Sequence, residues 1–175
     1  MLNEEKIKEA KSNVRSYLED NLLKKETFNS IVFEVLKKNA EESLETSEYL
    51  SSRSNLWTII TAYYSMFYIA NATLYKLGYK VGDKIAHKVT SDALVVFVRN
   101  KLKKSFLEEY EEIRYQALAG TKTDELVHFF DLERQKRGKI QYQTTENIKK
   151  QKAELSLQRA KEFNLAMRKL LRDIK

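Results

Sequence analysis

The stretch from residue 56 to residue 79 constrains the fold of this chain most, because its apolar side chains recur at helical spacing. They step by three or four residues, which places them along one side of an α-helix. Ser54 and Asn55 precede the stretch as N-cap residues, and Gly78 follows it as a helix terminator. Polar residues interrupt every apolar run well short of the ~20 residues that a membrane span needs. We therefore predict a core helix with the inward residues Leu56, Ile59, Ile60, Tyr63, Phe67, Ala70, Leu74 and Leu77.

The rest of the chain is also expected to be helical. It has 175 residues, no proline and four glycines, so few residues interrupt helices. Its length suits one domain with a single core. The run LVVFV at 94–98 is rich in β-branched residues, but a strand there would have no partner, so we predict a helix. Apolar periodicity predicts the other helices at about 3–23, 27–51, 90–102, 105–118, 124–137 and 145–174.

The expected fold class is all-α, an up-and-down helical bundle of about five to six helices without a sheet. The predicted helix within residues 1–25 is weakly apolar, so we expect an accessory element there and the bundle proper in 26–175. We expect Thr90 or Ser91 to cap the helix after the central one. The inward residues predicted for the last helix are Leu155, Phe163, Met167, Leu170 and Ile174.

Several classes of site are disfavoured. The chain has no cysteine, which excludes disulfides, thiolate catalysis and cysteine-ligated zinc. It has no phosphate-binding glycine loop and no His-Glu-x-x-His, and its two histidines, His87 and His128, are far apart. We expect no cofactor and no metal, and we expect His128, beside two phenylalanines, to be packed or at the surface. The charged start MLNEEKIKEAK lacks an apolar signal region, so a cytoplasmic location is expected.

The net charge of +7 is distributed unevenly. Residues 76–104 carry eight Lys or Arg against two acids, and residues 133–152 carry seven against two. Basic segments of this kind attract phosphate and release counterions when they bind nucleic acid. A solvated, lysine-rich surface that binds nothing is the alternative.

The string AYYSMFYIANATLYKLGY at 62–79, followed by the basic loop KVGDKIAHK with its histidine, resembles the HEPN family, named for higher eukaryotes and prokaryotes nucleotide-binding. The resemblance extends from about Phe28 to the C-terminus. It implies an all-α, HEPN-like bundle that is often dimeric. It also implies a context in which such a protein pairs with a small nucleotidyltransferase as toxin and antitoxin.

In HEPN ribonucleases an Arg is followed after four to six residues by a His, and two such motifs meet across a dimer. In ERQKRGKIQYQ at 133–143, Arg137 matches the Arg, and Tyr142 stands where the resemblance would place the His. The segment also resembles the R-x-x-A-D-Y pattern of small prokaryotic members, with Gln141 in place of Asp. Since a tyrosine with a pKa near 10 is a poor proton shuttle at neutral pH, ribonuclease activity of the HEPN kind is not expected. A purely structural pairing of Arg137 and Tyr142 with a neighbouring helix is the alternative.

We therefore expect a homodimer that binds nucleic acid or a nucleotide and is non-enzymatic or weakly active. The alternatives are a metal-independent ribonuclease toxin using Arg137 and Tyr142, supported by Arg134 or Lys139, and a plain protein-interaction module. His87 is expected near a helix start, where backbone N–H groups help to hold phosphate, although a cap or surface role is the commoner one. The candidate binding residues are Arg134, Arg137, Lys139, Tyr142, Tyr64, Asn71, His87, Lys84 and Lys88.

Overall fold

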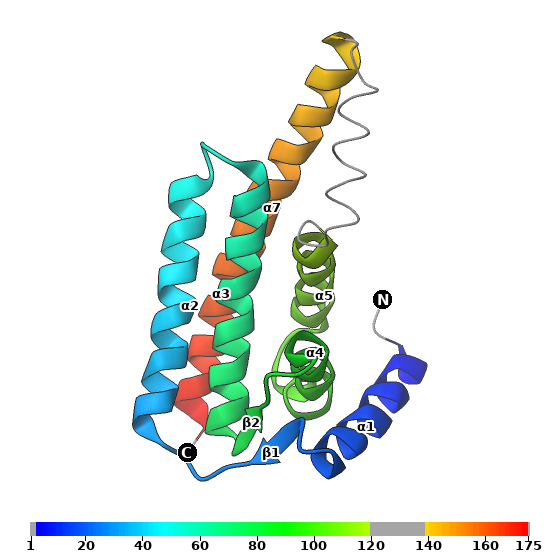
Figure 1. Cartoon of the computed structure of the whole chain (residues 1–175), viewed down its shortest axis with the longest axis vertical. Coiled ribbons are helices and arrows are strands. Elements are labelled where there is room, and N and C mark those ends of the chain that lie inside the picture. The colour runs from blue at the N-terminus through cyan, green and yellow to red at the C-terminus, as the bar shows by residue number, and fades with distance from the viewer. Residues whose placement is uncertain (1–2, 120–138, 175) are drawn as a thin grey trace.

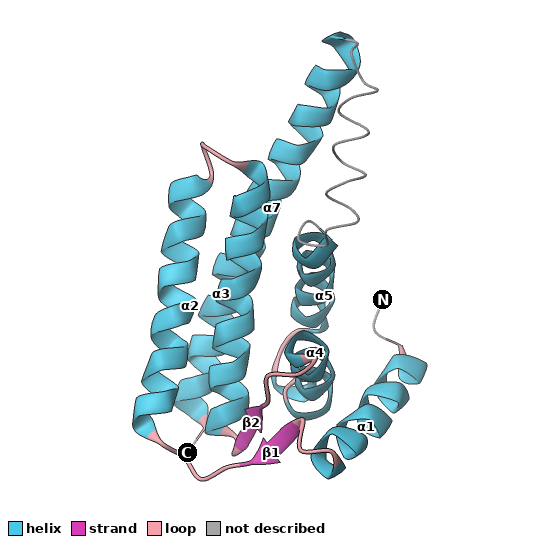
Figure 2. Ribbon diagram, viewed as in Figure 1, coloured by secondary structure: helices cyan, strands magenta, loops and turns pink. Residues whose placement is uncertain are grey.

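The computed structural model describes residues 3–119 and 139–174, and side chains within 3–118 and 149–174. These residues form a helical bundle with one small sheet (Figures 1 and 2). The helices are α1 (Glu4–Glu19), α2 (Ser30–Leu50), α3 (Asn55–Lys76), α4 (Ala86–Phe97), the 3-10 turn η1 (Arg99–Lys101), α5 (Lys104–Ala119) and α7 (Lys139–Asp173). The strands are β1 (Leu23–Lys25) and β2 (Tyr79–Val81). None of the described helices is long and apolar enough to cross a lipid bilayer.

Helix α3 is the centre of the bundle and contacts α2, α4, α5 and α7. Ser54 caps it by accepting the Trp57 N–H, as the sequence predicts. It is buried on more sides than the predicted stripe, because its polar residues Thr58, Ser65 and Thr73 are also inaccessible. Leu56, expected in the core, is 41% exposed. The prediction was wrong there because the buried side of this part of α3 carries Thr58 rather than Leu56.

The all-α fold class is confirmed, but the expectation of no sheet was wrong. Strands β1 and β2 pair antiparallel, with Leu23 opposite Val81 and Lys24 opposite Lys80. Each strand has only three residues, too short for the alternating pattern by which a strand is recognised. The ladder joins the segment after α1 to the end of α3. The proposed boundary between an accessory segment at 1–25 and the bundle at 26–175 stays a prediction. Strand β1 belongs to the first segment but pairs with β2 of the bundle.

Helix α4 begins at Ala86, so the prediction that Thr90 or Ser91 caps it was wrong. Ile85 takes the N-cap position in a left-handed conformation, with φ of 46°, and makes no side-chain cap bond. Thr90 and Ser91 are buried inside the helix instead. The LVVFV run is helical through Phe97, as predicted, and ends in η1.

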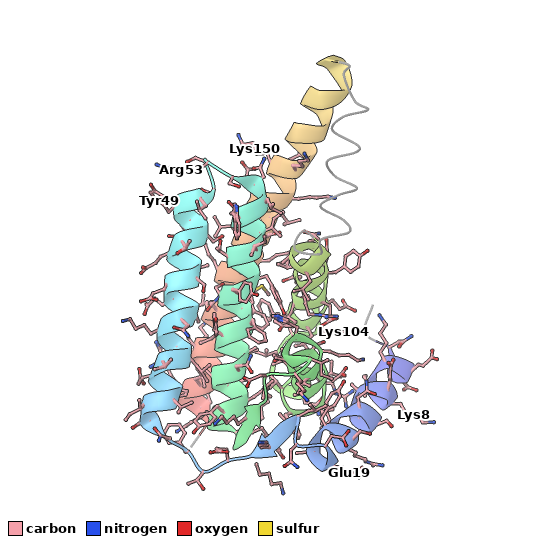
Figure 3. All side chains as sticks on the ribbon, viewed as in Figure 1. Lys8, Glu19, Tyr49, Arg53, Lys104 and Lys150 are labelled. Carbon is pink, nitrogen blue, oxygen red and sulfur yellow. The ribbon has the colours of Figure 1, made fainter. Side chains whose placement is uncertain are left out.

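Helix α7 begins at Lys139, earlier than expected, and its N-terminal part extends above the turn that joins α2 to α3 (Figure 1). Phe163, Met167 and Leu170 are buried as predicted, whereas Leu155 is 44% exposed. The helix predicted over 124–137 lies outside the described residues. On the outer side of α1, Lys8 and Glu19 point away from the bundle (Figure 3).

We predict that Phe163→Ala lowers the free energy of unfolding by about 3–5 kcal/mol, because it removes a fully buried ring from the core. The Phe163 ring stacks on Tyr110, with the ring centroids 5.6 Å apart. Urea denaturation followed by circular dichroism measures the change. The matched control on the same helix is Leu165→Ala, whose side chain is 59% exposed and whose loss should cost about 0.5 kcal/mol or less. Equal losses for the two variants would contradict the packing described.

Candidate functional site

His87 lies in the first turn of α4 and packs against aromatic rings of α3. Its Nδ1 is 2.8 Å from the Tyr63 hydroxyl oxygen, a hydrogen bond whose donor depends on the tautomer. Ring centroids of Phe67, Tyr63 and Tyr64 lie 4.6, 5.5 and 5.9 Å from the imidazole centroid. The aromatic residues of α3 therefore fix the orientation of a histidine that is still partly exposed.

Two effects lower the pKa of His87 below its ordinary value near 6.5. The larger is burial, which disfavours the charged imidazolium, and the second is the positive charge of Arg114. At neutral pH the ring is therefore mainly uncharged. It can accept or donate a hydrogen bond, but it contributes little positive charge for holding a phosphate.

Behind His87, the rings of Tyr63 and Tyr110 lie one after the other toward the interior of the bundle. Their centroids are 5.8 Å apart, and burial raises the pKa of both phenols well above the usual range. The Tyr110 hydroxyl interacts electrostatically with Tyr63 but lies outside hydrogen-bond geometry, and no described group bonds to it. Both phenols are therefore neutral at any physiological pH.

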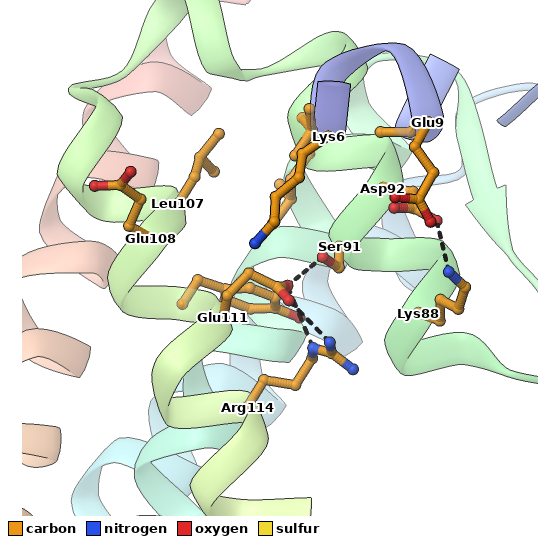
Figure 4. Close-up of a pocket in the computed structure, with 13 residues that line it drawn as sticks. Lys6, Glu9, Lys88, Ser91, Asp92, Leu107, Glu108, Glu111 and Arg114 are labelled. Carbon is orange, nitrogen blue, oxygen red and sulfur yellow. Dashed lines mark hydrogen bonds and ion pairs between the residues drawn. The ribbon is translucent and has the colours of Figure 1, made fainter. Parts of the chain in front are cut away.

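A charged group on α5 adjoins this pair of tyrosines. Arg114 donates from Nε and Nη2 to the two carboxylate oxygens of Glu111, at 3.2 and 2.8 Å, and Ser91 of α4 donates to the same carboxylate. Burial is the largest single effect and opposes the charge on Arg114, but the hydrogen bond and the charge of Glu111, together with Tyr63 and Tyr110, outweigh it and raise the pKa of the guanidinium. These groups line a cavity between α1, α4 and α5 (Figure 4).

Four of the residues predicted for the site gather around the start of α4 and the middle of α3. Lys84 is exposed in the loop before α4, and Lys88 is 3.7 Å from the Asp92 carboxylate one turn further along. Tyr64 is partly exposed next to His87. The structure thus brings Tyr64 next to His87, and Lys84 and Lys88 lie close to His87 along the chain.

Asn71 lies apart from this exposed group, because it is only 8% exposed. Its amide nitrogen donates to the Phe67 carbonyl oxygen at 2.8 Å and to the Thr90 hydroxyl at 3.2 Å. These bonds link α3 to α4 and account for an asparagine at this position. We therefore assign Asn71 a structural role and leave it out of the proposed contact surface.

The other predicted residues belong to a different part of the chain. Arg134 and Arg137, and also His128, lie outside the described residues. Lys139 and Tyr142 lie in the first turns of α7, where the structure does not describe side chains. Along α7, Tyr142 precedes Phe163, which packs against Tyr110, by about 30 Å of helical rise. A single chain therefore does not place Tyr142 beside His87.

The family model for the HEPN domain matches residues 33–170. This chain belongs to the HEPN domain family. A comparison with curated proteins and one with solved structures found no match. The match confirms the family predicted from the sequence, and it supports a nucleotide-binding or ribonuclease-type domain. It begins inside α2, so α1 and β1 lie outside the matched part of the HEPN domain.

Sequence reasoning did not single out the residues behind His87, namely Ser91, Tyr110, Glu111 and Arg114. The signal present was the pair of opposite charges at 111 and 114, since residues three apart are neighbours on a helix. A pair of this kind is common on exposed helix faces, so the sequence gave no reason to place it beside a cavity. Within the described ranges, no group of three or more His, Asp or Glu side chains is arranged to hold a metal ion.

We predict that the HEPN domain becomes less stable as the pH falls through the range below 6.5. Because the folded-state pKa of His87 is lowered, the unfolded chain binds the proton more tightly, and protonation favours unfolding. His87→Gln should remove that part of the pH dependence, measured as the free energy of unfolding between pH 5 and pH 8. NMR titration of the imidazole gives the pKa directly, with His128→Gln as the control that assigns the signal. A pKa of His87 at or above its ordinary value would contradict the described burial.

Proposed function

We propose that this HEPN domain binds single-stranded RNA as a homodimer and cleaves it little or not at all. The observation that carries the proposal is a row of accessible aromatic rings on α3 beside His87 and the lysines at the start of α4. Bases stack on such rings whatever their identity, while cations attract the phosphate backbone. The family match supports a nucleotide-related function in general, and the surface chemistry favours RNA.

The aromatic row follows the helical repeat of α3. Trp57, Tyr64 and Tyr68 lie at i, i+7 and i+11, which places them on the same side of the helix. Trp57 is 55% exposed and the two tyrosines are partly exposed. The ring centroids of Tyr64 and Tyr68 are 6.1 Å apart. The row therefore offers ring faces or edges over several turns of α3.

Basic residues at one end of this row supply the electrostatic part. Lys84 is exposed, and Lys80 stands opposite Lys24 on the outer side of the β1–β2 ladder. Like charges placed opposite one another repel, and a bound phosphate between them would relieve that repulsion. These lysines form no ion pair with any acid in the described part of the chain. The segment 133–152 adds a further basic stretch, in which we keep Arg134, Arg137, Lys139 and Tyr142 as proposed contacts.

A dimer is proposed through the Trp57 end of the aromatic row, which leaves Tyr64 and Tyr68 accessible to RNA. Leu56 and Trp57, 41% and 55% exposed, are apolar groups left uncovered at the N-terminal end of α3. Apolar and aromatic residues of this kind are enriched in the centres of protein interfaces. Tyr142 and His87 are far apart in one chain. A dimer would allow Tyr142 of one copy and His87 of the other to border a common groove. Pairing with a small nucleotidyltransferase as toxin and antitoxin is the wider context that the family resemblance implies.

We predict that a fluorescein-labelled single-stranded RNA binds weakly, with an affinity that falls as salt rises because counterions are released. Tyr64→Ala should weaken binding roughly 5- to 100-fold, since one base–aromatic stack contributes about 1–3 kcal/mol. Lys84→Gln should weaken binding and flatten the salt dependence. Fluorescence anisotropy at several salt concentrations measures both effects.

The matched control is Tyr115→Ala, an exposed tyrosine on α5 whose loss should leave RNA binding unchanged. Equal weakening of RNA binding by Tyr64→Ala and Tyr115→Ala would contradict base stacking on α3. Gel electrophoresis of the same RNA tests cleavage, which should be absent. Robust metal-independent cleavage, lost in Tyr142→Phe, would replace the proposal with a ribonuclease, whereas cleavage appearing only in Tyr142→His would support it.

We predict that the purified protein is a dimer at micromolar concentration and that Trp57→Ser shifts it toward monomer, because the change removes an exposed apolar ring from the interface. Light scattering after gel filtration gives the mass directly. Leu165→Ser, which changes an exposed apolar residue on α7, is the matched control and should stay dimeric. A monomeric parent protein would rule out the shared groove.

A further inference from the structure

A cavity of about 270 Å³ lies between α1, α4 and α5, away from the aromatic row of α3 (Figure 4). Helix α1 supplies one wall through Lys6, Glu9 and Ala10. Because α1 lies outside the part of the chain that matches the HEPN domain, this wall is a feature added to the matched domain. The volume corresponds to roughly nine water molecules, or a compound of about ten non-hydrogen atoms.

Helix α1 is held over the cavity by a defined polar contact. The Asp92 carboxylate on α4 accepts hydrogen bonds from the Tyr17 hydroxyl at 2.8 Å and from the Asn13 amide at 3.0 Å. Lys88 approaches the same carboxylate at 3.7 Å. Asp92 is thus neutralised and bonded, so it offers little repulsion to an anion in the cavity.

The lining divides into an apolar part and a polar end. The buried residues Ala10, Leu94, Val95 and Leu107 form the apolar part. The polar end contains Ser91, Glu111 and Arg114, which Figure 4 shows bonded together. A ligand that fits both parts has a hydrocarbon body and one polar group.

At the polar end of the cavity, the carboxylate oxygens of Glu111 already accept hydrogen bonds. Several donors there have no acceptor in the part of the chain that the structure describes. Glu111 receives Ser91 and two nitrogens of Arg114, so its two oxygens are engaged. Arg114 Nη1 and the Lys6 ammonium make no hydrogen bond or ion pair with the described residues, and Lys6 extends toward Glu111 in Figure 4. Tyr110 also lines the cavity, and its buried hydroxyl has no hydrogen-bond partner within the described ranges.

An excess of donors beside an apolar wall is complementary to an organic anion. Glu108 at the rim is paired with Lys104 at 3.8 Å, and Glu9 adds negative charge there, which disfavours a doubly charged ligand such as a phosphate monoester. We propose that this cavity binds a small organic monocarboxylate, whose carboxylate accepts from Arg114 and Lys6 and whose hydrocarbon body packs against Leu94, Val95 and Leu107. The cavity shares Lys88 with the proposed RNA surface, but its proposed ligand contacts Arg114, Lys6, Leu94, Val95 and Leu107 lie outside that surface.

The test uses the full chain with phenylacetate, a monocarboxylate of suitable size, and phenylacetamide, its neutral counterpart. Titration by ¹H–¹⁵N NMR should shift signals of α1, α4 and α5, with phenylacetate binding roughly tenfold more tightly than the amide because hydrogen bonds to charged groups are the stronger ones. Lys6→Gln should reduce that preference severalfold. Lys8→Gln, on the outer side of the same helix, should leave it unchanged.

Four results would overturn the proposal. The first is no response of these signals to phenylacetate at millimolar concentration, and the second is equal binding of acid and amide. The third is equal loss of binding in Lys6→Gln and Lys8→Gln. Inorganic phosphate is added in a separate titration, and displacement of phenylacetate by an equal concentration of phosphate would identify a general anion site and also overturn the monocarboxylate assignment. Since Lys6 is exposed, its substitution should not prevent folding.

Discussion

The burial of α3 on nearly all sides is the constraint on which the rest of the structure depends. A helix in that position must satisfy its own polar groups and those of its neighbours, because an unpaired buried polar group costs about 1–3 kcal/mol. The Asn164 amide on α7 donates to the Ser65 hydroxyl at 3.1 Å, and the Ser47 hydroxyl on α2 donates to the Thr58 carbonyl at 2.9 Å. These bonds fix how α2 and α7 are placed along α3 in addition to the packing of apolar side chains.

The same helix explains why the two proposed binding regions adjoin. Tyr63 is fully buried in α3, yet its hydroxyl reaches His87 at the surface of α4. Its ring also contacts Tyr110, which lines the cavity under α1. The surface histidine and the cavity under α1 are therefore connected through two packed tyrosines, of which Tyr110 lines the cavity. Since both phenols stay neutral, the connection between the two regions is one of packing rather than charge.

Much of the fold followed from local pattern, whereas little of the site did. The helical period and the scarcity of proline and glycine were sufficient to predict the all-α class. The tyrosine-rich string was sufficient to predict the HEPN family. The short β1–β2 ladder was missed because three residues carry no period, and the start of α4 because Ile85 adopts a left-handed conformation that an isoleucine rarely takes. Of the site, His87, Tyr64 and Lys84 were recognisable by residue type, but the Arg114–Glu111–Ser91 group depends on α5 packing against α4.

The sequence by itself determined that the fold class is all-α, that Ser54 caps α3, and that basic residues are concentrated in two segments. Those properties depend on neighbours within a few residues, so a linear pattern records them. Only the tertiary structure decided that Asn71 is buried against Thr90, that Asp92 holds α1 through Tyr17, and that a cavity remains between α1, α4 and α5. Such contacts join residues as far apart in sequence as Tyr17 and Asp92, at 75 positions, or Ser65 and Asn164, at 99 positions. Burial and pairing at that separation arise from how whole helices pack, which no local pattern encodes.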